Sequence, residues 1–177
     1  LGLPVPFYRS LLRGFSLVRR IGMGSKCVKY GSFVQRNSAG RNAVAAFTQD
    51  ANRGALALVG VYRTGGKGEP SIDGNQSHAL AAKGRFLFVT NAGDNTISAF
   101  RVQENGSLAL LSRTPSRGVR PVSMAAKKNV LLVVNQGIKA GKPGATGGNV
   151  RAFSIGADGS LSAIDGAVPG FLPKTSK

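Results

Sequence analysis

Three polar residues in the middle of the chain carry side chains that could act on an anionic substrate. His78 is the only histidine in the sequence, and an imidazole can accept or donate a proton near neutral pH. Arg120 carries a guanidinium that can bind a carboxylate or a phosphate through two parallel hydrogen bonds. Gln76 lies two residues before His78, so in a strand both side chains would share a face. We therefore predict His78 and Arg120 as catalytic candidates and Gln76 as a substrate-binding candidate.

Each of these residues also has a purely structural interpretation. Arg120 precedes a proline and could simply hold a turn, and His78 could be a partly buried structural residue. Asn91 and Asn135 are further substrate-binding candidates, but each follows an apolar run, where an asparagine commonly closes a turn by bonding to its own backbone. No acidic residue except Asp73 lies near His78 in the sequence, so no catalytic pair can be identified.

The sequence argues against several other kinds of site. One cysteine, Cys27, and one histidine cannot supply a disulfide framework or the usual ligands of a zinc site. The glycine-rich stretch 137–148 lacks the Gly-Lys-Ser/Thr ending of a phosphate-binding loop. Ser77 and Ser123 lack the sequence context of an activated serine nucleophile. We therefore predict neither a metal nor a cofactor.

The charge of the chain is strongly positive. The 177 residues include 24 Lys and Arg against 7 Asp and Glu, which gives a formal net charge of +17. This balance favours an anionic partner. We expect a small molecule rather than a nucleic acid, because the basic residues are not interleaved with aromatic residues as in nucleic-acid-binding modules. No apolar run approaches the length of about 20 residues that spans a bilayer.

The first part of the chain differs in composition from the rest. The first acidic residue is Asp50, and residues 1–49 contain eight Lys and Arg. A basic, acid-free start is typical of an organelle transit peptide, and it is equally typical of a wrongly assigned exon. We predict that residues 1–28 are a basic leader, disordered or targeting, which favours a cytoplasmic or organellar location.

A segment that occurs three times indicates the architecture. Each copy has an Asn, an apolar residue and an Ala-Phe pair, followed by a glycine turn and Gly-x-Leu. Phe47, Phe100 and Phe153 are 53 residues apart in both intervals. A fixed period of this length marks an array of like units that stack to bury their apolar faces. We expect the three phenylalanines to be equivalent buried residues on the third strand of each unit.

The units have the pattern of four-stranded antiparallel sheets. Asn-Gly and Asp-Gly pairs at the turns supply the positive φ angles of tight hairpins. Residues 86–89 and 130–134 are nearly continuous apolar runs, so we expect each to be buried on both faces between neighbouring sheets. Four short strands in roughly 45–50 residues describe a blade of a β-propeller. The sequence thus predicts an all-β fold of about two and a half blades, with these bounds: partial blade one at 31–60, blade two at 77–112, blade three at 121–165 and a tail at 172–177.

The stretch from Gly84 to Val102, with Gly106-Ser-Leu108 after it, resembles the lactonase, or carboxymuconate-cyclase-like, family of seven-bladed β-propellers. Its Val-Thr-Asn core is similar to the Tyr-Val-Thr-Asn repeat of that family, with Phe88 at the Tyr position. The resemblance covers residues 31–171. It implies hydrolysis of a sugar lactone such as 6-phosphogluconolactone, or cycloisomerisation of a muconate-type diacid, without a metal. Related propellers are also non-catalytic binding or scaffold modules, which is the alternative function.

In such a propeller, the loops that enter the innermost strands lie at the mouth of the central channel. Gln76 and Arg120 precede matching strands by the same distance, so we expect both at that mouth. The chain begins with Leu1 and stops where a fourth blade would begin, so we expect a partial copy. Its open blade faces would then need the remaining blades or further copies as partners, and an inactive truncated fragment is the third possibility.

Overall fold

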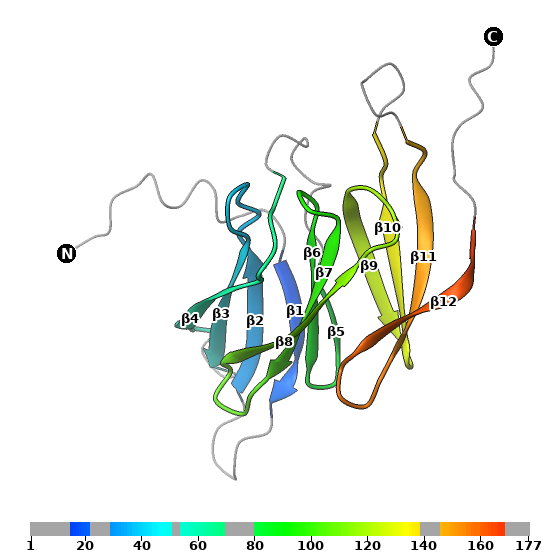
Figure 1. Ribbon diagram of the computed structural model, residues 1–177. Coiled ribbons are helices and arrows are strands. Elements are labelled where there is room, and N and C mark those ends of the chain that lie inside the picture. The colour runs from blue at the N-terminus through cyan, green and yellow to red at the C-terminus, as the bar shows by residue number, and fades with distance from the viewer. Residues whose placement is uncertain (1–14, 22–28, 51–53, 70–79, 139–145, 169–177) are drawn as a thin grey trace.

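Twelve β-strands make up the described part of the chain, and they form three sheets (Figure 1). The computed structural model describes residues 15–21, 29–50, 54–69, 80–138 and 146–168. Sheet A consists of β1 (Phe15–Ile21), β2 (Lys29–Gln35), β3 (Ala43–Asp50) and β4 (Leu56–Arg63). Sheet B consists of β5 (Leu80–Lys83), β6 (Phe86–Asn91), β7 (Thr96–Val102) and β8 (Leu108–Pro115). Sheet C consists of β9 (Pro121–Lys127), β10 (Val130–Asn135), β11 (Asn149–Ile155) and β12 (Leu161–Val168).

Each sheet is an antiparallel meander whose strands follow one another in chain order. β5 contacts both β1 and β9, so the first strands of the three sheets meet along one side, as the inner strands of propeller blades do. The described residues include no helix that is long and apolar enough to cross a membrane. The arrangement confirms the predicted all-β fold of four-stranded antiparallel blades.

Sheet A is more complete than the sequence analysis expects. β1 pairs with β2 from Phe15 opposite Val34 to Ile21 opposite Lys29. The composition of the sequence predicts a basic leader over residues 1–28, and the repeat predicts a partial blade that starts at residue 31. In the structure, residues 15–21 instead form the inner strand of a four-stranded blade that ends at Arg63. The acid-free composition that suggested a leader does not prevent this pairing, because backbone groups make the ladder hydrogen bonds.

The hairpin between the third and fourth strands of each sheet turns at a glycine with positive φ. Gly54, Gly106 and Gly159 have φ angles of 67°, 83° and 89°, a region that is open to glycine and costly for most other residues. A side chain at Gly159 would also collide with the ring of Phe86, because its Cβ would lie 2.6 Å from that ring. The turn glycines therefore hold the repeat in register, as the sequence pattern predicts.

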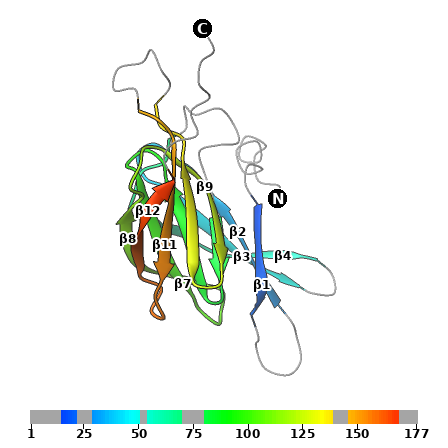
Figure 2. The same ribbon diagram turned by 90° about the vertical axis from the view of Figure 1, so that its right-hand side faces the viewer.

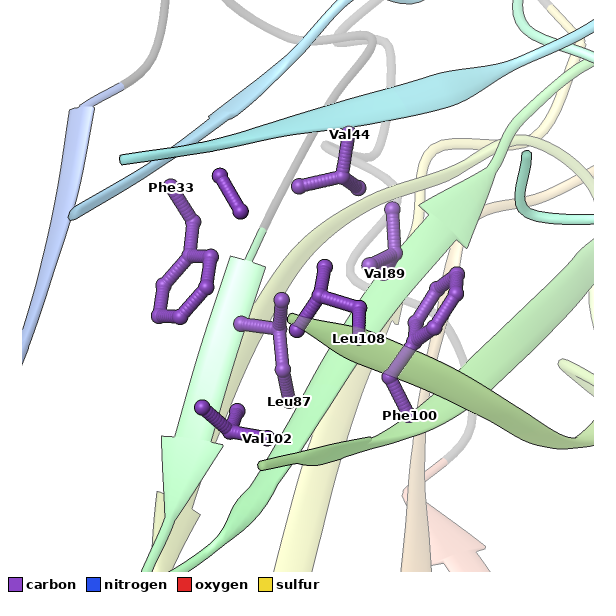
Figure 3. Packing of buried hydrophobic residues seen from close by; sticks show 8 residues of the cluster. Phe33, Val44, Leu87, Val89, Phe100, Val102 and Leu108 are labelled. Carbon is purple, nitrogen blue, oxygen red and sulfur yellow. The ribbon is translucent and has the colours of Figure 1, made fainter. Parts of the chain in front are cut away.

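Apolar residues fill the two interfaces between neighbouring sheets. Between sheets A and B, Phe33, Val44 and Ala46 pack against Leu87, Val89, Phe100, Val102 and Leu108 (Figure 3). Between sheets B and C, the buried residues are Phe88, Ile97, Ala99, Leu131, Val133, Phe153, Ile155 and Leu161. Sheet B therefore contributes one face to each cluster and lies between the other two sheets.

The two outer sheets are each covered on one face only, which corrects two expectations. Residues 87–91 of β6 are all buried, but buried and exposed residues alternate along β10. Leu132 and Val134 are 45% and 38% exposed, so the expected burial of 130–134 on both faces is wrong. Phe100 and Phe153 are buried, whereas Phe47 is half-buried. Both differences have one cause: no described strand packs on the outer face of sheet A or sheet C.

Candidate functional site

One end of the molecule gathers the segments that join successive sheets. The connectors 64–69 and 116–120 lie there, together with the turns after β2, β6 and β10, because neighbouring strands run in opposite directions. We call this the connecting end; it is the upper end in Figure 1. Asn91, Arg120 and Asn135 lie at this end, whereas Gln76 and His78 lie outside the described residues.

The backbone of Arg120 is held firmly where the chain enters β9. Its φ angle is 57°, in the left-handed region that costs a residue with a Cβ about 1–2 kcal/mol. Its N–H donates a hydrogen bond to Oδ1 of Asn95 at 2.8 Å, and its carbonyl accepts one from the N–H of Gln136 at 2.9 Å. Asn95 lies in the β6–β7 turn of sheet B, and Gln136 follows β10 of sheet C. Contacts from two sheets therefore fix the place from which the Arg120 side chain extends.

Three arginines lie at the connecting end of sheet C, on the connector 116–120 and at the start of β11. The carbonyl of Arg117 accepts hydrogen bonds from Nε of Arg151 at 3.1 Å and from Nδ2 of Asn149 at 3.3 Å. Arg120 is three residues further along the same connector and is half-buried. We call Arg117, Arg120 and Arg151 the basic edge.

The basic edge has no acidic partner within the described residues. The ion pairs between described residues join Arg85 to Glu104 at 3.3 Å and Arg113 to Asp94 at 3.5 Å. Neither pair includes a residue of the basic edge. The edge therefore presents positive charge to solvent, and an anion that binds there need not displace a carboxylate of the described chain.

Asn91 is fully buried between sheets A and B, and both polar atoms of its side-chain amide are hydrogen-bonded. Its Nδ2 donates to Oγ of Ser98 at 2.7 Å and to Oγ1 of Thr96 at 3.1 Å. Its Oδ1 accepts from Nδ2 of Asn42 at 2.9 Å. With no exposed surface, Asn91 joins two blades in this structure and presents no polar atom to a ligand.

Asn135 is the matching residue of sheet C and is 1% exposed. Its Nδ2 donates to the carbonyl of Ser116 at 3.2 Å and to Oδ1 of Asn149 at 2.8 Å. Its Oδ1 is buried without a hydrogen-bond partner among the described groups. In the β9–β10 ladder Asn135 lies opposite Pro121, so it is adjacent to Arg120. Of the sequence candidates, the structure therefore brings Arg120 and Asn135 together.

A glycine covers each of these asparagines closely. A Cβ on Gly66 would lie 2.4 Å from the side chain of Asn91, and one on Gly118 would lie 2.5 Å from that of Asn135. Each glycine is the third residue of a connector with the pattern Thr/Ser-x-Gly, at 64–66 and 116–118. This Thr/Ser-x-Gly pattern, which follows the last strands of sheets A and B, is a second repeat that the sequence carries and that could have pointed to these contacts.

Outside the connecting end, one carboxyl group of the described residues has a shifted pKa. Hydrogen bonds from the hydroxyl and then from the backbone N–H of Ser160 lower the pKa of Asp158, which lies in the β11–β12 turn at the opposite end. Within the described ranges, no three His, Cys, Asp or Glu side chains group closely enough to hold a metal ion. The connecting end therefore offers cationic and hydrogen-bonding groups, which suit an anionic, oxygen-rich ligand.

The chain matches the model of a protein family. The model of the family "Lactonase, 7-bladed beta-propeller" matches residues 40–142, which is more than half of the chain. The match begins before β3 and extends past β10, so it includes the stretch 84–108 that carries the resemblance, but it is shorter at both ends than the expected range of 31–171. No curated protein matches the chain.

Three solved structures share the fold at low sequence identity. The periplasmic gluconolactonase of Pseudomonas aeruginosa superposes with a TM-score of 0.59 and 21% identity, covering 79% of this chain and 37% of that one. A protein from Lactobacillus plantarum gives a TM-score of 0.54 and 18% identity, covering 86% and 55%. A functionally unknown protein from Desulfotomaculum acetoxidans gives 0.53 and 16%, covering 85% and 51%. The chain thus spans between 37% and 55% of the length of these structures.

Proposed function

This chain belongs to the lactonase family of seven-bladed β-propellers, and we propose that its connecting end binds an anionic sugar lactone. The observation that carries the proposal is the basic edge. Arg120 is fixed by hydrogen bonds from sheets B and C, and its guanidinium forms no ion pair within the described residues. Such an arginine could bind a phosphate or a carboxylate through two parallel hydrogen bonds.

A gluconolactone is the substrate class suggested by the Pseudomonas aeruginosa gluconolactonase, which shares the fold. The net charge of +17 favours a lactone that carries an anionic group, such as 6-phosphogluconolactone, over a neutral one. A muconate-type lactone has a carboxylate that could occupy the same position. Both classes combine a negative charge with a lactone carbonyl.

Hydrolysis of such a lactone needs a cation and a proton acceptor. Water adds to the lactone carbonyl carbon, the ring C–O bond breaks, and the departing ring oxygen takes a proton to leave a hydroxy acid. An arginine near the carbonyl would stabilise the negative charge that develops on its oxygen. His78 is our candidate for accepting the proton from water, with Gln76 as a hydrogen-bonding neighbour. We assign Asn91 to the joint between blades rather than to substrate binding, because its amide groups are already paired.

Binding can be tested apart from turnover with 6-phosphogluconate, the open-chain product. We expect calorimetric titration to detect binding, and we expect Arg120→Gln to weaken it by about tenfold or more, because a hydrogen bond to a charged group contributes about 1.5–3 kcal/mol. Neutral gluconolactone should bind more weakly than the phosphorylated acid.

Lys128→Gln is the matched control. Lys128 is exposed, has a positive φ of 51°, and lies between β9 and β10 at the opposite end of sheet C. Its replacement removes the same charge from the same sheet and should leave binding unchanged. If Arg120→Gln binds 6-phosphogluconate as tightly as the wild type does, the assignment of Arg120 is overturned. If Arg120→Gln and Lys128→Gln lose affinity equally, the loss is a general effect of net charge.

A further inference from the structure

An uncharged apolar stripe crosses the outer face of sheet C. Leu132 lies opposite Ala152, which lies opposite Ile164, and Val134 lies opposite Val150. Leu132 and Ile164 are 45% and 42% exposed. We call these five residues the C face; sheet C is the sheet nearest the viewer in Figure 2.

The repeat shows what covers these positions elsewhere in the molecule. In sheet B, the residues 44 or 53 positions earlier than Leu132, Val150 and Ala152 are Phe88, Ile97 and Ala99. Those three side chains have no exposed surface, because the next sheet packs on them. The C face is therefore the same kind of surface without its covering sheet.

Sheet A has the complementary open surface. Phe47 lies opposite Leu58, and Ala45 lies opposite Val61; we call these four residues the A face. Leu58 and Val61 are 61% and 58% exposed. Phe47 occupies the repeat position of Phe100, which packs against the preceding sheet. The A face is thus the surface with which a blade covers the one before it.

We propose that the C face of one chain binds the A face of a second copy of the same chain. Each chain carries both members of a pair of surfaces that already pack together twice within it, sheet B on sheet A and sheet C on sheet B. Neither set of residues includes a charged side chain, although the chain has 24 Lys and Arg. On the same sheet faces, Arg63 and Lys127 lie at the ends of β4 and β9. The contact is head-to-tail, and such contacts form rings or open chains rather than two-fold dimers.

The geometry predicts a specific response to substitution. Because each contact uses one A face and one C face, Leu58→Glu and Leu132→Glu should each abolish self-association. A mixture of the two variants still offers one intact A face and one intact C face. The mixture should therefore form a one-to-one pair that cannot grow further.

Sedimentation velocity measures this directly at chain concentrations from about 1 to 100 µM, where contacts of ordinary strength dissociate. We expect the wild type to exceed the mass of one chain, each variant to have that mass, and the equimolar mixture to have twice that mass. Ala157→Glu, in the exposed β11–β12 turn, is the control for the change in charge and should behave as the wild type. Ile164→Glu replaces Leu132→Glu if circular dichroism shows that the latter does not fold.

The proposal is overturned by any of three results. A wild type that keeps the mass of one chain at all concentrations would show that the faces do not meet. Association that survives Leu58→Glu would indicate a two-fold contact through the C face alone. Variants that are monomeric both alone and in the mixture would mean that the two faces do not recognise each other.

Discussion

Phe47, Phe100 and Phe153 occupy the same position on the third strand of three successive sheets, and their burial differs. Phe100 and Phe153 are 1% and 0% exposed, because each ring packs against the preceding sheet. Phe47 follows an alanine as the other two do, but no described strand lies on its side of sheet A, and it is half-buried. Burial of this residue type is therefore set by the neighbouring sheet and not by the repeat.

Replacing these phenylalanines by alanine should separate the two situations. We expect Phe100→Ala to lower the free energy of unfolding by about 3–5 kcal/mol, as large-to-small changes in a core do. Phe47→Ala should cost roughly 1–2 kcal/mol, because the burial energy scales with the apolar area removed from water. Urea denaturation of both variants measures the difference, and equal losses would contradict it.

The glycines above the buried asparagines provide a second comparison between residues. Gly118→Ala would place a methyl group 2.5 Å from the Asn135 side chain, and overpacking of this kind typically costs 1–3 kcal/mol. At Gly40, by contrast, a Cβ would meet nothing within 4 Å, so Gly40→Ala should be neutral or slightly stabilising. Thermal unfolding of the two variants tests this, and a stable Gly118→Ala protein would show that the connector can move away from Asn135.

At the scale of the strand, β6 and β10 have nearly the same apolar sequence and different surroundings. Residues 86–89 and 130–134 are both continuous apolar runs, but only β6 has a sheet on each side. A single sequence indicates that such a strand can be buried on both faces. It does not indicate whether a second neighbour is present, since that depends on which sheets surround the strand.

The rate of backbone amide hydrogen exchange should differ between the two strands in the same way. We expect the backbone amide of Leu87 in β6 to exchange more slowly than that of Leu131 in β10, because sheet C is covered on one face and opens at a lower free energy. Both side chains are fully buried, so they form a matched pair. Equal protection in dilute protein would contradict the expectation, and slower exchange at Leu131 with rising concentration would accompany self-association.

The element that the sequence analysis missed is β1. Its residues, Phe15–Ile21, have no strict alternation and carry two adjacent arginines, Arg19 and Arg20. Its pairing with β2 depends on backbone hydrogen bonds to residues up to 19 positions away, and these leave no side-chain pattern.

The candidate site shows the same limit: Arg120 could be predicted from its place before a strand, but the contacts of Gly66 with Asn91 join residues far apart in the sequence.

At the scale of the molecule, a spacing of 53 residues predicted stacked antiparallel sheets, and the structure and the family match agree with it. The spacing could not show that the first sheet has four strands, because the first copy of the repeat begins at Asn42, just before the third strand. The net charge of +17 predicted an anionic partner in general terms. Only the fold shows that Arg117, Arg120 and Arg151 meet at one end, because two of them lie on a connector and the third on β11.

We predict that the 177-residue protein binds a phosphorylated sugar acid but hydrolyses lactones little above the spontaneous rate. A catalytic site on the channel of a propeller needs groups from several blades held to within about 0.5 Å. The family has seven blades, and the described residues form three sheets, so we expect them to supply only one wall of such a site, with Arg120.

The assay compares gluconolactone and 6-phosphogluconolactone, with His78→Ala and Arg120→Ala as controls, at chain concentrations below and above that of any self-association. If hydrolysis appears only in the associated protein, a second copy supplies the missing groups. Turnover by the isolated chain that is well above the spontaneous rate and is lost in either variant would contradict the prediction, since three blades would then be enough to hold the proton acceptor and the cation around one lactone.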